Sequence, residues 1–201
     1  AVGDGKTGTL HVCNASGFTS LLKPNDKFHG YVNRWRKMMR VVETVKLKTR
    51  RLDDMDEIPD VDLLKIDIQG GEQAVFKHGK KKLAGVLSVI TEVAAVPLYE
   101  NQPLLDDQMR TLRGLGLDLH KFIFFKAVSL NHPTAPRMRG RIAKDQLVDG
   151  DAVFVRGLLD LGSMDVEALK RLAVIADGSY DSVDFTLHLL HMLEARGAVA
   201  S

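Results

Sequence analysis

Three carboxylates occupy positions in the sequence from which they could do chemistry together. Asp67 ends the apolar run 61–68, and Glu92 lies at the end of a second apolar run, 86–93. If the two runs form parallel neighbouring strands, both side chains finish at the same edge of a sheet, where open α/β sheets bind ligands. Glu72 follows closely, in the first turn of a helix predicted after two glycines. Acids in such a crevice can accept a proton, stabilise a cation or bind a metal.

A structural explanation of the same residues is also open. Asp67 could cap the following helix, and Lys65 lies on the same strand face by the two-residue period and could neutralise it. Glu72 is favourable in the first turn of a helix because of the helix dipole alone. The residues themselves do not decide between a catalytic and a structural interpretation.

The elements that must position these acids are predicted from apolar periodicity. The run 61–68 is nearly continuous, which is typical of a strand buried on both faces of a parallel sheet, and the helix after it is predicted to end at Gly79. The alternation of strands and helices predicts an α/β layered fold. Further strands are predicted at 8–12, 45–50, 86–93, 122–128 and 151–156, helices near 105–112 and in the tail on both sides of Asp177–Ser179, and loops at 14–25 and from Asn131 to about Arg141.

Composition excludes several classes of protein. A net charge of +2 on 201 residues gives no long-range field that would favour nucleic acid. The single cysteine, Cys13, excludes an internal disulfide framework and fits a reducing compartment, so a cytoplasmic location is expected. No apolar run approaches the roughly 18 residues of a membrane span.

The segment 31–51 is strongly basic, with eight lysines or arginines and one acid, Glu43. Only Tyr31 and Trp35 lie near these cations, so the interleaved aromatic residues of a nucleic-acid platform are lacking. A solvated strand face is the favoured explanation. Attraction of an acidic or phosphorylated acceptor is a second possibility.

No metal site is expected from the histidines. Of the seven, only His188 and His191 are close neighbours, three residues apart on a predicted tail helix. Such a pair is more often part of a packed or exposed helix face than a metal site, and no cysteine or acid completes a ligand spacing. The common phosphate loops and the Gly-x-Ser-x-Gly elbow are also missing from the sequence.

The segment 62–79, DLLKIDIQGGEQAVFKHG, closely resembles the signature of FkbM-type methyltransferases, D-x-LKID-V-E-G-x-E-x-x-V-L-x-G. Shorter resemblances flank it at Thr19–Leu21 with Lys23–Asn25, Leu52–Asp54, Ile90–Val93 and Gln146–Arg156. The resemblance covers about Ala1 to Arg156. Residues 1–156 are therefore predicted to form an FkbM-like domain, and residues 157–201 a helical C-terminal extension.

Two departures from the family pattern stand out. Gln69 occupies a position where the family usually has Glu, so a role that needs a charge there is in doubt. The family's first strand and its Gly-rich cofactor loop are not found, and Ala1–Asp4 resembles the end of the family's third strand. The chain thus resembles the C-terminal two-thirds of a methyltransferase, and by itself it is expected to bind the cofactor weakly or not at all.

The resemblance implies a Rossmann-like class I methyltransferase fold, without its first strands and with a short helical tail. It implies transfer of a methyl group from S-adenosylmethionine to a hydroxyl of a sugar or other small metabolite, without nucleic acid or membrane as partner. Alignment of the two reactants would supply most of the acceleration. The alternative is a non-catalytic α/β binding module or an inactive fragment.

The resemblance also assigns roles to individual residues. Asp67 is the first candidate for catalysis and lies near the methyl group, so it also counts as cofactor-binding. Glu72 and Glu92 are further catalytic candidates. Ser20 is expected to contact the acceptor, and Val2 to border the adenine.

Overall fold

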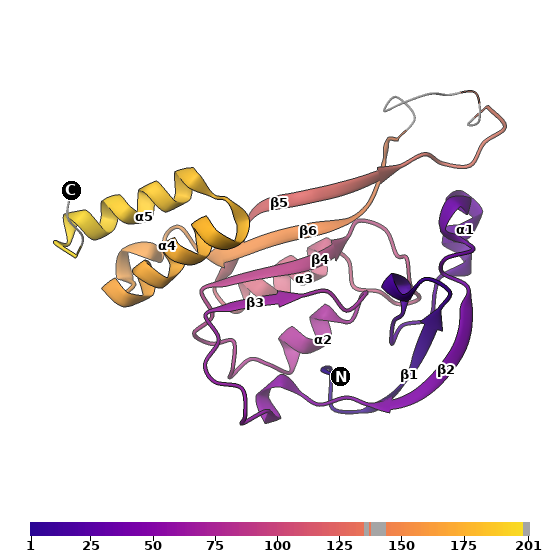
Figure 1. Ribbon diagram of the computed structural model, residues 1–201, viewed down its shortest axis with the longest axis horizontal. Helices are drawn as coiled ribbons and strands as arrows, with labels where there is room; N and C mark the ends of the chain where they lie inside the picture. Colours follow the sequence, from indigo (N-terminus) through magenta and orange to yellow (C-terminus); the bar gives the residue numbers. More distant parts are fainter. Residues whose placement is uncertain (135–136, 138–143, 199–201) are drawn as a thin grey trace.

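Two sheets of unequal size form the frame of the computed structural model, which describes residues 1–134, 137 and 144–198 (Figure 1). The smaller sheet is an antiparallel pair, β1 (Thr7–Cys13) and β2 (Val41–Lys48). The larger sheet has four strands in the order β3-β4-β6-β5. Its members are β3 (Leu63–Ile66), β4 (Ser88–Ala94), β5 (Leu117–Val128) and β6 (Gln146–Arg156).

Five α-helices accompany the sheets in the described part of the chain. They are α1 (Asp26–Tyr31), α2 (Glu72–Lys77), α3 (Leu105–Arg113), α4 (Val166–Tyr180) and α5 (Val183–Ala195). Short 3-10 turns lie at Ser16–Phe18, Asn33–Trp35, Leu52–Asp54 and Leu161–Ser163. The predicted α/β arrangement is confirmed.

Strands β3 and β4 are parallel, as the first interpretation of the carboxylates required, and α2 lies between them in the chain. Strand β6 is antiparallel to both β4 and β5. All seven residues of β4 are buried, because it has a strand on each side and apolar layers on both faces. The sheet is therefore mixed, and its parallel part is the part that carries the acids.

Helices cover both faces of the larger sheet. Val89 and Val93 of β4 pack with α2 and α3, whereas Ile90 of the same strand packs with α4 and α5. The two-residue period of the strand sends these side chains to opposite faces. The C-terminal helical segment is thus joined to the sheet by a continuous apolar core.

Strand β3 differs from its prediction in length and burial. The run 61–68 was expected to be buried on both faces, but only Leu63–Ile66 pair as a strand, and only Ile66 among these is buried. The physical reason is position, because β3 is an edge strand of the described sheet and has a neighbour on one side only. Partial packing against the core between the sheet and helices α2 and α3 remains for Val61, Leu64 and Ile68.

Several predicted boundaries shift. The tail helices divide at Asp181 and Ser182, after the predicted break at 177–179, because Asp181 takes the left-handed backbone (φ 48°) that ends α4 while Gly178 continues the helix. Strands β5 and β6 start earlier than expected, and most of the predicted loop from Asn131 to about Arg141 lies outside the described residues.

Gly79 follows α2 as predicted, for a different reason from the one expected. It does not take a left-handed backbone, and His78 is the capping residue. A Cβ atom at Gly79 would lie 2.8 Å from the Val75 carbonyl oxygen and 2.9 Å from Leu52 Cδ2. Close packing between the helix end and the 52–54 turn therefore requires glycine here.

None of the described helices has the length and apolar character needed to cross a membrane.

Candidate active site

The parallel register of β3 and β4 brings the predicted acids together. Ile66 lies opposite Thr91, so the next residues along, Asp67 and Glu92, leave the same edge of the sheet. Glu72, from the first turn of α2, joins them. Carboxylate oxygens of the three side chains all lie within 4.8 Å of one another. We call these three residues the acid cluster.

The side chain of Gln69 holds two members of the acid cluster. Its Nε2 donates to Asp67 Oδ1 at 2.8 Å and lies 3.1 and 3.0 Å from the two carboxylate oxygens of Glu92. Its Oε1 accepts a hydrogen bond from the Tyr99 hydroxyl at 2.9 Å. Its backbone has a positive φ of 58°, which is uncommon for a residue other than glycine.

Gln69 was not among the residues selected from the sequence as part of the site. The signal that could have found it was its departure from the family's Glu. An amide at this position offers two N–H donors to neighbouring acids, which a carboxylate cannot do. The substitution therefore replaces repulsion inside the acid cluster by hydrogen bonds.

Glu72 closes the turn between β3 and α2. It is almost fully buried (1% exposed), and its Oε1 accepts from the backbone N–H groups of Ile68 at 2.8 Å and Gly70 at 3.2 Å. Burial raises the pKa of Glu72, and the two backbone hydrogen bonds oppose that rise. Its position is thus fixed by hydrogen bonds to the backbone in addition to the helix dipole.

The structural interpretation of Asp67 is wrong in both of its parts. The residue that precedes α2 as its cap is Gly71, and no side chain caps that helix end. Lys65 forms its ion pair with Asp151 of β6, at 2.9 Å, and not with Asp67. Asp67 is exposed, and its Oδ2 has no hydrogen-bond partner among the described residues.

The surroundings of Glu92 favour its neutral form. Burial raises the pKa of Glu92 to about 9, and the charges of Asp67, Glu72 and Asp149 add to the rise, while the Gln69 hydrogen bond opposes it. Burial, followed by the charge of Glu92, also raises the pKa of the Tyr99 hydroxyl. The cluster therefore carries a bound proton near neutral pH, and Tyr99 remains a hydrogen-bond donor.

A cavity of about 410 Å³ opens in front of Asp67. Val2, Ser20 and Asp67, three residues selected from the sequence, all line it together with Gln69, whereas Glu72 and Glu92 do not. Ser20 is nearly fully buried (1% exposed), and its hydroxyl donates to the Gln69 carbonyl oxygen at 2.7 Å and accepts from Leu22 N at 2.9 Å. Ser20 therefore braces the Gln69 turn as well as bordering the cavity.

The carboxylates of the acid cluster lie close enough to one another to hold a divalent cation. Among the described residues, this is the group of His, Cys, Asp or Glu side chains with that spacing. Its oxygens, however, are engaged by other donors. Gln69 Nε2 bonds to Asp67 and Glu92, and two backbone N–H groups bond to Glu72. These bonds engage one oxygen of Asp67, one of Glu72 and both of Glu92, and they leave Asp67 Oδ2 free.

Comparison with known proteins identifies the family of the chain. The family described as "Methyltransferase FkbM domain" matches residues 1–119, which is more than half of the chain. The chain therefore belongs to the FkbM methyltransferase family, an S-adenosylmethionine-dependent class with a Rossmann-like fold. Searches of curated proteins and of solved structures find no match. The matched region contains the whole acid cluster, Gln69 and the cavity in front of Asp67.

Proposed function

We propose that this domain methylates a hydroxyl oxygen of a sugar or other small metabolite, with Asp67 as the residue that accepts the hydroxyl proton. The observation that carries the proposal is the position of Asp67. It is the member of the acid cluster that lines the 410 Å³ cavity, and its Oδ2 remains free of hydrogen bonds in the described structure. Gln69 fixes the other oxygen, Oδ1.

The residues around the cavity fit a sulfonium methyl donor. A wall that contains the Asp67 carboxylate attracts a cation, and Val2, Leu10 and Ile68 add apolar surface for a flat ring. The volume lies in the range of small-molecule sites. S-adenosylmethionine supplies the electrophilic methyl group when it is bound.

The exposed member of the acid cluster and its two buried members have different roles in this proposal. Asp67 would accept the proton of the acceptor hydroxyl at Oδ2 while the hydroxyl oxygen bonds to the methyl carbon and the carbon–sulfur bond breaks. The sulfonium charge and the carboxylate charge are both lost in this step. Glu72 and Glu92 would act through the turn and Gln69, by holding Asp67 in place, and are positioning residues.

The test is methyl transfer from labelled S-adenosylmethionine to a panel of sugars and small alcohols, assayed with the 201-residue chain and with a chain extended before Ala1. In whichever chain is active, Asp67→Asn should lower kcat about a hundredfold or more, because a general base contributes 10²–10⁴-fold. Asp60→Asn, at an exposed acid outside the cavity, is the matched control. Full activity of the Asp67→Asn variant would overturn the assignment.

Cofactor binding is tested separately by calorimetric titration of the same two chains. The 201-residue chain is expected to bind S-adenosylmethionine weakly or not at all, and the extended chain to bind it. Absence of binding by a folded extended chain would contradict the proposed function itself, whatever the result for Asp67.

A further inference from the structure

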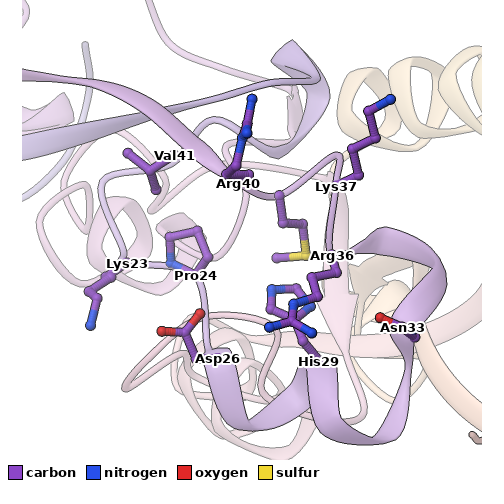
Figure 2. Close-up of a pocket in the computed structure, with 10 residues that line it drawn as sticks. Lys23, Pro24, Asp26, His29, Asn33, Arg36, Lys37, Arg40 and Val41 are labelled. Atoms are coloured by element: carbon purple, nitrogen blue, oxygen red, sulfur yellow. The ribbon is translucent and has the colours of Figure 1, made fainter.

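A second cavity, of about 640 Å³, lies between the 23–29 segment and the 33–41 segment (Figure 2). Its walls carry four cations, Lys23, Arg36, Lys37 and Arg40, against one acid, Asp26. None of these residues lines the cavity in front of Asp67. We call it the basic cavity.

Most of the cations of the basic cavity are unpaired. Lys23 has an ion-pair partner in Glu100, at 2.8 Å. Arg36, Lys37 and Arg40 are exposed, and no ion pair in the described part of the chain includes them. Elsewhere in the same basic segment the pattern differs, because Arg50 pairs with Glu57 at 2.5 Å and Arg51 with Asp54 at 2.7 Å.

A buried histidine adds an unsatisfied polar group to the wall. His29 is 8% exposed, and its Nδ1 is buried without a hydrogen-bond partner. Buried polar atoms usually have hydrogen-bond partners, so His29 Nδ1 stands out among the residues that line this cavity. Burial lowers the pKa of His29, the Asp26 carboxylate opposes that effect, and the Arg36 charge adds to it. Both charged groups therefore act on the ring, in keeping with their positions around it in Figure 2.

The polar groups approach the cavity from two sides. In Figure 2 the Arg36 guanidinium and the His29 ring lie together and Asp26 faces them, whereas the Lys37 and Arg40 side chains, from the same segment as Arg36, extend away from this group. Asn33, a further lining residue, can donate or accept. Guanidinium groups present paired N–H donors that match the oxygens of phosphate, which a lysine cannot imitate.

We propose that the basic cavity binds a small phosphomonoester, with the Arg36 guanidinium on the phosphate, the exposed Arg40 side chain turning in from the wall to join it, and Asp26 accepting from a hydroxyl of the same ligand. The excess of unpaired cations in a concave site favours a compact dianion. The one carboxylate, next to Arg36 and His29, favours a ligand that also carries hydroxyl donors, such as a sugar phosphate. The proposal does not depend on methyl transfer, because the cavity is separate from Asp67.

An extended polyanion such as RNA is less well matched. Trp35 is buried and so gives no stacking surface, and Tyr31, which is 67% exposed, lines a different, apolar hollow. Stacking on exposed aromatic side chains supplies much of the affinity of single-strand binders.

The test is a titration of the 201-residue chain, followed by NMR and calorimetry, with glucose 6-phosphate, inorganic phosphate, glucose and a short oligonucleotide. Glucose 6-phosphate should bind more tightly than phosphate, glucose should not bind, and amide shifts should be confined to the 23–41 region. The Arg36→Ala/Arg40→Ala variant should bind at least about tenfold more weakly. Replacing the same two arginines by lysine should lower the affinity less than alanine does. Lysine keeps the positive charge, although it lacks the paired N–H donors.

Two further variants test the role of Asp26 and separate binding in the cavity from a general effect of surface charge. Asp26→Asn should strengthen binding of inorganic phosphate about two- to threefold, because a like charge beside the anion is removed. Lys80→Ala/Lys81→Ala removes two exposed charges outside the cavity and should change affinity by less than twofold. An equal loss in this control, equal binding of glucose, absence of binding by every phosphate compound, or a preference for the oligonucleotide would each overturn the proposal.

Discussion

The acid cluster and the basic cavity differ in how the repulsion between their like charges is reduced. Each gathers like charges, three carboxylates in one case and Arg36, Lys37 and Arg40 in the other. The acids are mostly buried, and their repulsion is removed by a proton on Glu92 and by the neutral amide of Gln69. The cations are exposed, so water screens them without partners. Burial therefore decides whether a charge cluster must be neutralised by the protein itself.

Among the substitutions that test stability, the largest effect is expected from removing the buried acceptor of the acid cluster. Glu72→Ala should lower the free energy of unfolding by about 3 kcal/mol, because the N–H groups of Ile68 and Gly70 lose their shared acceptor inside the protein. Urea denaturation at pH 7 measures it. Glu72→Gln keeps an acceptor oxygen and should stay within about 1 kcal/mol of the parent chain. Equal losses for the two variants would mean that the carboxylate charge, not the hydrogen bonds, matters.

Replacing Gln69 by the glutamate that the family usually has should restore the repulsion within the acid cluster. Gln69→Glu would place a fourth carboxylate against Asp67 and Glu92 and remove the Nε2 donor, so a loss of about 2 kcal/mol is expected near pH 8. The loss should shrink at lower pH, where the added acid binds a proton. A Gln69→Glu chain as stable as the parent at pH 8 would show that the amide bridge contributes little.

The proton on Glu92 makes stability depend on pH. The folded pKa of about 9 lies above the ordinary 4.5, so the folded chain binds this proton more tightly than the unfolded chain does. Stability from this source is complete below about pH 4.5 and is lost as pH rises toward 9, by at most about 1.4 kcal/mol per pH unit. Unfolding measured from pH 5 to 9 should show this decline, and Glu92→Gln should flatten it. A parent profile that rises over this range would refute the assignment.

The smallest effect should come from the basic cavity. Arg36→Ala/Arg40→Ala should leave the free energy of unfolding within about 0.5 kcal/mol, since both side chains are exposed and unpaired in the described structure. The Arg40 carbonyl oxygen, which accepts from Asn14 N, is unchanged by the substitution. Thermal unfolding at low and high salt measures the effect. A loss of several kcal/mol would mean that these cations are structural.

Much of the fold could be predicted from the sequence because local patterns specify it. The buried run of β4, strand β1 and the amphipathic α3 formed where periodicity placed them. Strand β2 was predicted at 45–50 but runs from Val41 to Lys48, and seven of its eight residues are exposed. The acids of the site could also be predicted, since parallel strands must bring Asp67 and Glu92 to one edge. These features depend on neighbours within a few residues or on a single strand pairing.

Other features depend on contacts that no local pattern contains. Lys65 finds its partner 86 residues away in Asp151, and β3 lies at a sheet edge only because β4 and β6 take the interior. The division of the basic segment into paired Arg50 and Arg51 and unpaired Arg36 and Arg40 likewise follows from which acids the fold brings near.

The sequence by itself determined the class of fold, the family and the acids at the strand ends. Only the tertiary structure decided that Gln69 joins Asp67 to Glu92, that Asp67 alone of the three faces the cavity, and that His29 lies buried beside Arg36. The physical reason is that charge and hydrogen-bonding roles are set by burial and by partners in space, and these exist only once the distant segments have packed.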